Sequence, residues 1–297
     1  MKPLIVDVRR NSLDDGPGIR TVIFFKGCPL SCVWCQNPET KSMSQEISFI
    51  KNNCANCKKC LEVCESKAID FNYKFRIFRD KCNLCGICIN TCQNDALKFA
   101  GKYYEIKDLV ALILKDKTFY LNSGGGVTFS GGEPTFHMEY LNKLLIELKK
   151  ENIHICLETC GYFNGEIFNN FILPYIDLIY FDLKIFDPKL HLKYCKVPNQ
   201  IILNNFEQLI KIKKIEILPR IPLIPKITAT KDNLINLANY LKTQNIKKLA
   251  LLPYNPLWIS KTEIIGIKPE YKRTNSMNQK EKDVIKEIFS EFEYKGF

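Results

Sequence analysis

The sequence predicts an α/β fold built on a parallel sheet, with a small cysteine-rich insertion. Three observations carry this prediction. Short apolar runs typical of buried strands alternate with amphipathic runs at helical spacing, and repeated β-α units of this kind form parallel sheets. Polar or cysteine residues follow each apolar run, as expected where the carboxyl ends of parallel strands meet at one edge. A repeat of closely spaced cysteines interrupts the alternation after the first strand, which indicates an inserted subdomain.

Six β-α units account for most of the chain. The predicted strands are residues 21–25, 127–130, 153–158, 178–182, 215–221 and 248–252. The predicted helices are residues 106–115, 138–150, 164–172, 206–212, 231–243 and 279–292. Residues 1–50 and 101–297 are expected to form the α/β body, and residues 51–100 the insertion. A length of 297 residues fits one such body and does not require a second independent domain.

Every predicted strand ends in residues suited to binding a ligand. The six ends carry, in order, Cys28 with Cys32 and Cys35, the run Gly131-Gly132-Glu133-Pro134, Glu158-Thr159, Asp182-Leu183-Lys184, Arg220, and Pro253-Tyr254-Asn255. Polar residues at one strand end are ordinary turn chemistry, but at six ends they converge on one site. For Glu158, Asp182 and Lys184, a plain ion pair at a strand end is the alternative interpretation.

The motif Cys28-x₃-Cys32-x₂-Cys35 supplies three thiols directly after the first strand. Thiolates bind zinc or iron–sulfur clusters, and three of them leave one coordination position open for a small molecule. We therefore expect a 4Fe-4S cluster with one open iron, with zinc or chance spacing as the alternatives. Upstream, residues 14–20 read as a turn, which would lie at the mouth of the same site.

An internal repeat aligns without a gap at an offset of 28 residues between Cys54 and Phe99. Both halves have the spacing Cys-x₂-Cys-x₂-Cys-x₃-Cys-x₃-Ala-x₂-Phe, which is typical of two-cluster bacterial ferredoxins, where the fourth cysteine of each run crosses to the other cluster. That rule predicts one cluster on Cys54, Cys57, Cys60 and Cys92, and another on Cys82, Cys85, Cys88 and Cys64. Zinc is the alternative metal. No proline follows Cys64 or Cys92, which departs from the ferredoxin pattern.

Composition excludes several other classes of protein. No apolar run is long enough to span a membrane and the first residues lack a signal peptide, so we expect a cytoplasmic protein without a membrane partner. Of the 14 cysteines, eleven lie in short regular clusters, which favours metal binding over disulfides. The net charge of +11 is spread along the chain rather than gathered in a basic block, so no nucleic-acid partner is expected.

Taken together, these motifs resemble the radical S-adenosylmethionine (SAM) superfamily and, within it, the activating enzymes of glycyl radical enzymes. The resemblance rests on the three-cysteine motif with Trp34, the Gly131-Gly132-Glu133-Pro134 run, the ferredoxin-type insertion between them, and the Asp-Gly-Pro-Gly-Ile-Arg segment ending at Arg20. It extends from about residue 5 to residue 256.

The resemblance implies a partial (β/α)₆ barrel that binds three 4Fe-4S clusters and SAM. One electron from the open cluster would split SAM into methionine and a 5'-deoxyadenosyl radical, which takes a hydrogen atom from a glycine of a partner glycyl radical enzyme. The two inserted clusters would relay electrons from a flavodoxin- or ferredoxin-type donor. In some members of the family a monovalent cation lies near SAM. The resemblance does not name the partner enzyme.

The resemblance also implies roles for individual residues, at the positions of this sequence that match the family's motifs. Catalysis is assigned to the three cysteines of the open cluster and Lys184. SAM contacts are assigned to Trp34, Gln36, Gly131, Gly132, Glu133, Glu158, Thr159, Asp182, Lys184, Arg220 and Asn255. Asn255 stands where many relatives have His, and His191 also matches a family position. Two loops depart from the family, at residues 195–199 and 226–229, and both are expected near the partner.

Two rival functions and several structural interpretations stay open at this point. A radical SAM enzyme for a small molecule or another peptide would share the clusters, and a non-catalytic iron–sulfur electron carrier would not bind SAM. Cys156, Cys160 and Cys195 are interpreted as small packing residues, and His137 and His154 as structural or exposed. The tail after Pro269 is expected to be solvated surface and a terminal helix.

Overall fold

A nine-stranded sheet forms the body of the computed structural model, which describes residues 2–296. The strand order is β11-β10-β9-β8-β7-β6-β2-β1-β5. Six consecutive strands of this order are mutually parallel: β2 (Arg20–Phe25), β6 (Gly126–Gly131), β7 (His154–Thr159), β8 (Leu178–Asp182), β9 (Glu216–Leu223) and β10 (Lys248–Pro253). All six predicted strands are therefore confirmed, with bounds that shift by one or two residues.

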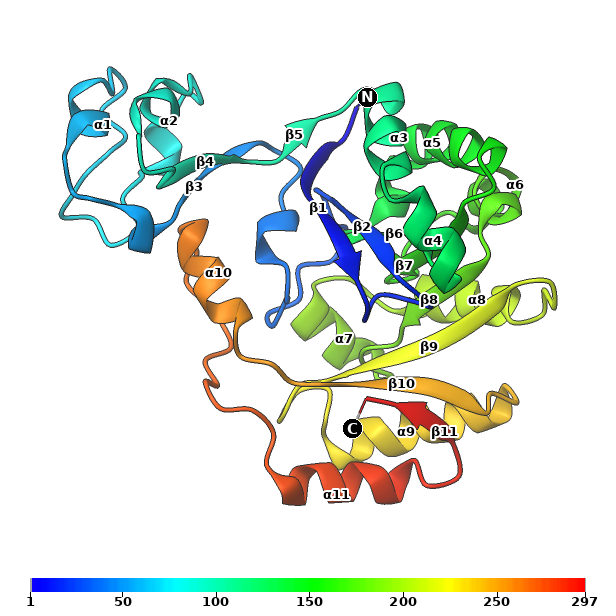
Figure 1. Ribbon diagram of the computed structural model, residues 1–297. Coiled ribbons are helices and arrows are strands. Elements are labelled where there is room, and N and C mark those ends of the chain that lie inside the picture. Colours follow the sequence, from blue (N-terminus) through cyan, green and yellow to red (C-terminus); the bar gives the residue numbers. More distant parts are fainter. Residues whose placement is uncertain (1, 297) are drawn as a thin grey trace.

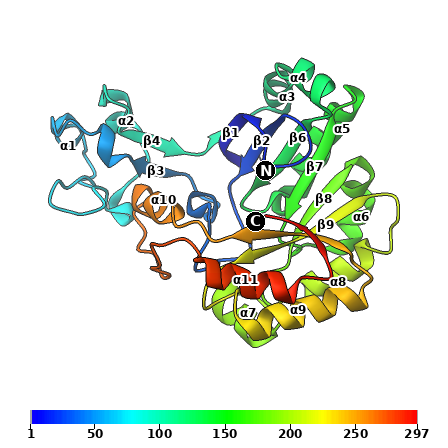
Figure 2. The same ribbon diagram turned by 60° about the horizontal axis from the view of Figure 1, so that its bottom comes forward.

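Three further strands complete the edges of the sheet and were not predicted. β1 (Leu4–Ser12) pairs antiparallel with β2, and β5 (Lys102–Tyr103) pairs antiparallel with β1. At the other edge, β11 (Glu293–Lys295) pairs parallel with β10. The two edges of the sheet curl toward each other. At the amino ends of the strands, Gly16 and Pro17, which precede β2, therefore line the same cavity as β11. The sheet is thus an incompletely closed barrel (Figure 2).

Helices cover the outer face of this sheet (Figure 1). They are α3 (Ile106–Leu114), α4 (Lys117–Ser123), α5 (Met138–Lys150), α6 (Gly165–Phe171), α7 (Pro188–Cys195), α8 (Gln200–Leu209), α9 (Lys231–Thr243) and α11 (Gln279–Ile288). The remaining helix of the body, α10 (Trp258–Ile264), lies away from the sheet, against Pro38–Thr40 and Glu46–Phe49 (Figure 1). Short 3₁₀ turns lie at η1 (Pro38–Thr40), η2 (Lys51–Asn53), η3 (Arg79–Lys81), η4 (Pro134–His137) and η5 (Leu173–Tyr175). Among residues 2–296, no helix is both long and apolar enough to cross a bilayer.

In the body, two predicted helices need correction and three helices were missed. The helix placed at residues 206–212 begins at Gln200 and ends at Leu209, because Asn205 does not act as a turn residue: its buried amide donates to the carbonyls of Gly161 and Phe163 at 2.9 and 2.8 Å. The last helix ends at Ile288 rather than at residue 292, where the chain turns into β11. Helices α4, α7 and α10 had not been predicted.

Residues 46–100 form a lobe that projects from the body beside β1 and β5 (Figures 1 and 2). Its two antiparallel strands are β3 (Glu46–Phe49) and β4 (Leu97–Ala100), and its short helices are α1 (Lys59–Glu62) and α2 (Ile87–Thr91). The lobe has its own buried cluster, made of Ile47, Phe49, Ile69, Ile77, Cys88, Ala96 and Leu97. Burial of this cluster stabilises the lobe apart from the main core.

Candidate active site at the carboxyl ends of the parallel strands

An open cavity of about 1100 Å³ lies at the carboxyl ends of the six parallel strands. Every one of these strands contributes to its wall, directly or through the loop that follows. The sequence-predicted residues that line it are Cys28, Cys32, Trp34, Cys35, Gln36, Gly131, Gly132, Glu158, Thr159, Asp182, Lys184 and Arg220, together with Asp14 and Asp15 from the turn before β2. The expected convergence of the strand ends is thus observed, and its size suits a nucleoside-sized ligand.

The three-cysteine loop leaves β2 through Gly27, whose φ of 104° favours glycine. The Gly27 N–H donates to the carbonyl of Thr40 at 2.7 Å, and its carbonyl accepts from Glu133 N–H at 2.8 Å. On the other side, the amides of Ser31 and Val33 donate to the carbonyls of Cys195 and Tyr194 at 2.9 and 3.1 Å. The end of α7 and the loop after β6 therefore fix the shape of the cysteine loop.

The donor set fits an iron–sulfur cluster better than a single metal ion. Cys28, Cys32 and Cys35 are free thiols that face the cavity. Within residues 2–296, no three His, Cys, Asp or Glu side chains are arranged around one ion as a zinc site requires. Burial, reinforced by Cys32 and Cys28, raises the pKa of Cys35 to about 12. Iron would remove this proton on binding, because the thiolate is the ligand.

Two thiols that the sequence analysis had treated as packing residues lie against this motif. A hydrogen bond from Cys195, at the end of α7, lowers the pKa of Cys32 and outweighs the opposite effect of burial. Cys160 lines the cavity and is hydrogen-bonded with Cys28, and burial raises its pKa. The position of Cys160 directly after Thr159, at the end of a predicted strand, could have indicated that it lies at the cavity. No sequence signal pointed to Cys195, since α7 itself had not been predicted.

Four charged residues form one network on the cavity wall. Arg220 donates through Nη1 to Glu158 Oε1 at 2.5 Å and through Nε to Asp182 Oδ1 at 2.8 Å. Lys184 Nζ lies 3.1 Å from Asp182 Oδ2, and Ser130 Oγ donates to Glu158 Oε2 at 2.5 Å. Burial raises the pKa of Asp182, but Arg220 and Lys184 outweigh it and hold the pKa below its usual range. The network is neutral overall and offers both signs of charge to a zwitterionic ligand.

Gly131 and Gly132 bring the end of β6 against the cysteine loop. A Cβ at Gly131, where φ is 104°, would lie 2.5 Å from the backbone nitrogen of Phe25, and one at Gly132 would lie 2.2 Å from the carbonyl oxygen of Gly27. Both contacts are with backbone, so neither neighbour can turn aside. The glycines are therefore required by the fold of the site itself, in addition to any close approach of a ligand.

Three sequence-predicted residues lie away from the cavity. Glu133 is fully buried and its carboxylate accepts from Thr135, from Thr159 Oγ1 at 2.9 Å and from Cys160 N–H at 2.7 Å. It therefore supports the cavity wall from behind. Asn255 is exposed and its Oδ1 accepts from Leu257 N–H at 3.0 Å in a turn. His191 is buried, with Nδ1 2.7 Å from the Val197 carbonyl, and holds the turn after α7.

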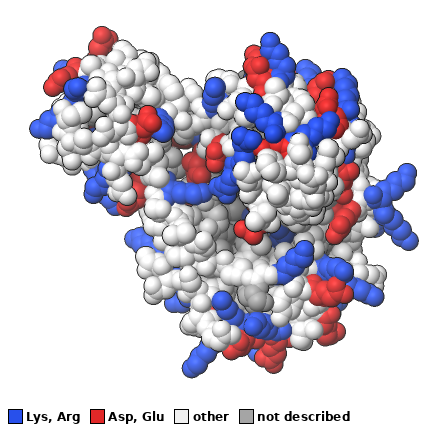
Figure 3. Space-filling model, viewed as in Figure 1, with Lys and Arg blue, Asp and Glu red and all other residues white. Residues whose placement is uncertain are grey.

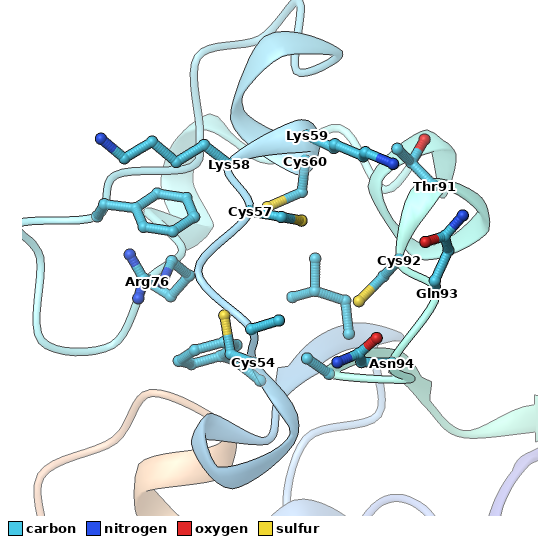
Figure 4. Close-up of a pocket in the computed structure, with 15 residues that line it drawn as sticks. Cys54, Cys57, Lys58, Lys59, Cys60, Arg76, Thr91, Cys92, Gln93 and Asn94 are labelled. Atoms are coloured by element: carbon cyan, nitrogen blue, oxygen red, sulfur yellow. The ribbon is translucent and has the colours of Figure 1, made fainter.

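The eight thiols of the lobe lie in two groups. Cys54, Cys57, Cys60 and Cys92 surround one pocket (Figure 4). Around Cys88, burial raises the pKa to about 11, and the neighbouring thiols that add to this shift are Cys82, Cys64, Cys60 and Cys85, so the second group lies close to Cys60 of the first. In both groups the fourth cysteine comes from the other half of the repeat, as the ferredoxin spacing predicts.

Comparisons with known proteins agree with this geometry. Residues 77–238 match the model of the radical SAM superfamily, and residues 14–72 match that of a 4Fe-4S single cluster domain. The chain is 37% identical to the trans-4-hydroxy-L-proline dehydratase activating enzyme of Clostridioides difficile, over 97% of this chain and 96% of that protein. It is 36% identical to the (2S)-3-sulfopropanediol dehydratase activating enzyme of Klebsiella oxytoca, over 92% and 87% of the two chains.

A solved structure supports the fold. A radical SAM methyltransferase from Sphaerobacter thermophilus superposes with a TM-score of 0.55 at 12% identity, covering 99% of this chain and 76% of that one. At this identity, the likeness concerns the arrangement of the sheet and helices alone.

Proposed function

Because the chain belongs to the radical SAM superfamily and, within it, to the activating enzymes of glycyl radical enzymes, we propose that its cavity is the site of that activation. The enzyme activates a partner glycyl radical enzyme with SAM and an iron–sulfur cluster. When bound, the cluster supplies one electron to SAM, and the resulting 5'-deoxyadenosyl radical removes a hydrogen atom from a glycine of the partner. The observation that carries the assignment is the meeting of three cysteines and a charged network in one cavity.

Cys28, Cys32 and Cys35 would hold the open cluster, which leaves one iron for SAM. Lys184 has one hydrogen-bond partner in the described chain, Asp182, although an ammonium carries three donors. Its remaining N–H groups suit the carboxylate of the methionine part of SAM, and Arg220 would add a second cation there. Asp182 and Glu158 would face the positively charged groups of SAM.

The monovalent cation of some family members has less support here. All four carboxylate oxygens of Glu158 and Asp182 already accept a hydrogen bond from Arg220, Lys184 or Ser130. The two basic side chains supply the charge that such a cation would bring. Equal SAM affinity in potassium-containing and potassium-free buffer would support this interpretation, and a tenfold dependence on potassium would contradict it.

The two thiol groups of the lobe would each hold a 4Fe-4S cluster, giving three clusters in all. Their role would be to pass electrons from a flavodoxin- or ferredoxin-type donor toward the cysteine loop. Anaerobically reconstituted protein is expected to contain about 12 irons per chain. A value near four would contradict the two lobe clusters, whereas a value near eight that is unchanged in a Cys28→Ala variant would contradict the open cluster.

The direct test combines the reconstituted enzyme, SAM, a reductant and a candidate glycyl radical enzyme. The relatives act on different partners, so a glycyl radical enzyme encoded beside this gene is the first candidate. Paramagnetic resonance should show a glycyl radical that depends on SAM and disappears when the partner's glycine is replaced by alanine. SAM cleavage without any protein radical, across candidate partners, would favour an enzyme for a small molecule instead.

A further inference from the structure

Arg76 is a buried cation beside the pocket formed by Cys54, Cys57, Cys60 and Cys92. Its side chain lines that pocket, and the residue is 9% exposed. The guanidinium carbon lies 3.6 Å from the ring centre of Phe71 and 5.0 Å from that of Phe49. In Figure 4 Arg76 lies on the same side of the pocket as Cys54. Two aromatic rings thus hold the positive charge in place next to the thiols.

The protein itself leaves much of this guanidinium unsatisfied. Nη2 has one long hydrogen bond, to Asn56 Oδ1 at 3.5 Å, while Nε and Nη1 are buried without a partner among the described residues. Within residues 2–296, no carboxylate lies within 4.0 Å of Arg76. A buried charge and buried N–H groups without partners are costly, so their presence indicates an anionic acceptor that completes the site. The pocket of four thiols is where such an acceptor would lie.

The internal repeat makes this environment specific to one of the two thiol groups. The cationic residues lining the pocket are Lys58, Lys59 and Arg76, and no acidic residue lines it. The positions 28 residues after Lys58 and Lys59 are Gly86 and Ile87, which are uncharged, and Arg76 lies after the end of the first repeat, so it has no counterpart in the second. Arg79 lies near Cys82 of the second group, and its Nε and Nη2 are also buried without a partner among the described residues. It differs from Arg76 because its side chain is 26% exposed and faces Glu46 at 3.9 Å, which partly compensates its charge. The first group therefore has a buried cation without a carboxylate partner, and the second does not.

We propose that Arg76 is the charge partner of a 4Fe-4S cluster held by Cys54, Cys57, Cys60 and Cys92, and that it makes this cluster easier to reduce than its twin. The inference rests on the proposed presence of the lobe clusters. A four-thiolate cubane carries net negative charge, which grows by one unit on reduction, so a buried cation stabilises the reduced form more. Arg76 acts through the cluster and is a positioning residue for electron storage, without contact to SAM or to the partner's glycine.

The test is a redox titration of the full-length reconstituted enzyme followed by paramagnetic resonance, which reports the potential of each cluster. Arg76→Met keeps an unbranched stem for the aromatic rings and removes the charge. We expect it to lower the reduction equilibrium constant of one cluster at least tenfold, which is about 59 mV for one electron, with the other two unchanged. Arg76→Lys, which keeps the charge, should stay within threefold of the wild type.

Lys59→Met is the matched control, since Lys59 lines the same pocket but is exposed to solvent. Its charge is screened, so we expect a change of less than threefold. Unchanged potentials in Arg76→Met at full iron content, or equal shifts in Arg76→Met and Lys59→Met, would overturn the inference. A merely structural role for Arg76 would lower the iron content of both Arg76 variants without moving a potential, and this too would overturn it. Wild-type protein with about four irons would instead refute the lobe clusters themselves.

Discussion

Replacing Lys184 by methionine separates a SAM contact from a plain ion pair at a strand end. The ammonium lies on the cavity wall, its side chain is 11% exposed, and Asp182 is its one hydrogen-bond partner in the described chain. Asp182 keeps Arg220 as a partner at 2.8 Å when Lys184 is lost, so both carboxylates still have a cationic hydrogen-bond partner, although the network gains one net negative charge. Folding should therefore change little in this variant, while any ligand carboxylate at the site loses its partner.

The expected size follows from one lost charge-assisted hydrogen bond, about 1.5–3 kcal/mol. The dissociation constant of SAM should rise roughly 10- to 150-fold in Lys184→Met. Calorimetric titration of SAM into the unreduced, reconstituted enzyme measures this constant. Lys193→Met, an exposed lysine on α7, is the control and should bind SAM like the wild type.

Arg220→Met gives the contrasting case. Glu158 would keep only the neutral Ser130 as a partner, and the penalty for a buried carboxylate without its cation is about 3–5 kcal/mol. This variant should lose thermal stability as well as SAM affinity, whereas Lys184→Met should lose affinity alone. If Lys184→Met bound SAM within twofold of the wild type with its iron content intact, Lys184 would be no more than an ion-pair partner of Asp182.

Three further outcomes are expected. Gly132→Ala should displace the cysteine loop and lower the iron content by about four per chain, because its Cβ would lie 2.2 Å from the Gly27 carbonyl oxygen. Gly124→Ala is the control: its Cβ meets nothing within 4 Å, so it should keep its iron, although its φ of 67° strains the backbone and should lower thermal stability. Cys195→Ala should retain all its iron but lower the potential of the open cluster, because hydrogen bonds to ligand sulfurs influence that potential; an unchanged potential would leave Cys195 as a packing residue. Burial is the main cause that lowers the pKa of all three histidines, His137, His154 and His191. Below a pH of about 6.5, the unfolded chain therefore binds more protons than the folded protein, and the free energy of unfolding should fall as the pH drops. The slope is at most about 1.4 kcal/mol per pH unit for each histidine. Thermal unfolding at pH 5, 6 and 7 measures this slope, which should be smaller in His191→Gln, and an equal slope in that variant would contradict the assignment.

The parallel strands β2 and β6 were predictable because they are buried on both faces and form apolar runs, whereas β9 alternates between buried and partly exposed residues. In β2, for example, all six residues are buried, as is typical of the central strands of a parallel sheet. The edge strand β1 is mostly exposed after its first two residues, and two of the three residues of β11 are exposed, so neither strand forms an apolar run and their pairing depends on partners distant in the sequence. The start of α8 was missed for a related reason: asparagine favours turns locally, and the buried contacts of Asn205 with Gly161 and Phe163 override that preference.

Within the site, the sequence indicated which residues gather but not which of them face the ligand. Residues at strand ends alternate between the cavity and the interior, and Glu133 is turned inward by Thr135, Thr159 and the Cys160 amide. Asn255 lies two residues beyond the end of β10, where its side chain accepts a hydrogen bond from its own loop. A motif position therefore predicts a place in the fold, and the surrounding hydrogen bonds decide the role.

Residues outside both cysteine motifs hold the lobe against the cysteine loop. Buried Lys26, directly after β2, donates to the carbonyl of Glu39 and to Glu46 Oε2, both at 2.7 Å, and Glu46 begins β3 of the lobe. Lys261 of α10 lies 3.2 Å from the carbonyl of Gln36, and Glu263 on the same helix pairs with Lys74 of the lobe at 2.8 Å. Electron transfer between the lobe and the loop requires a fixed separation, and these contacts supply it from two sides. The short helix α10, in a stretch without cysteines, thereby helps to position the lobe against the cysteine loop.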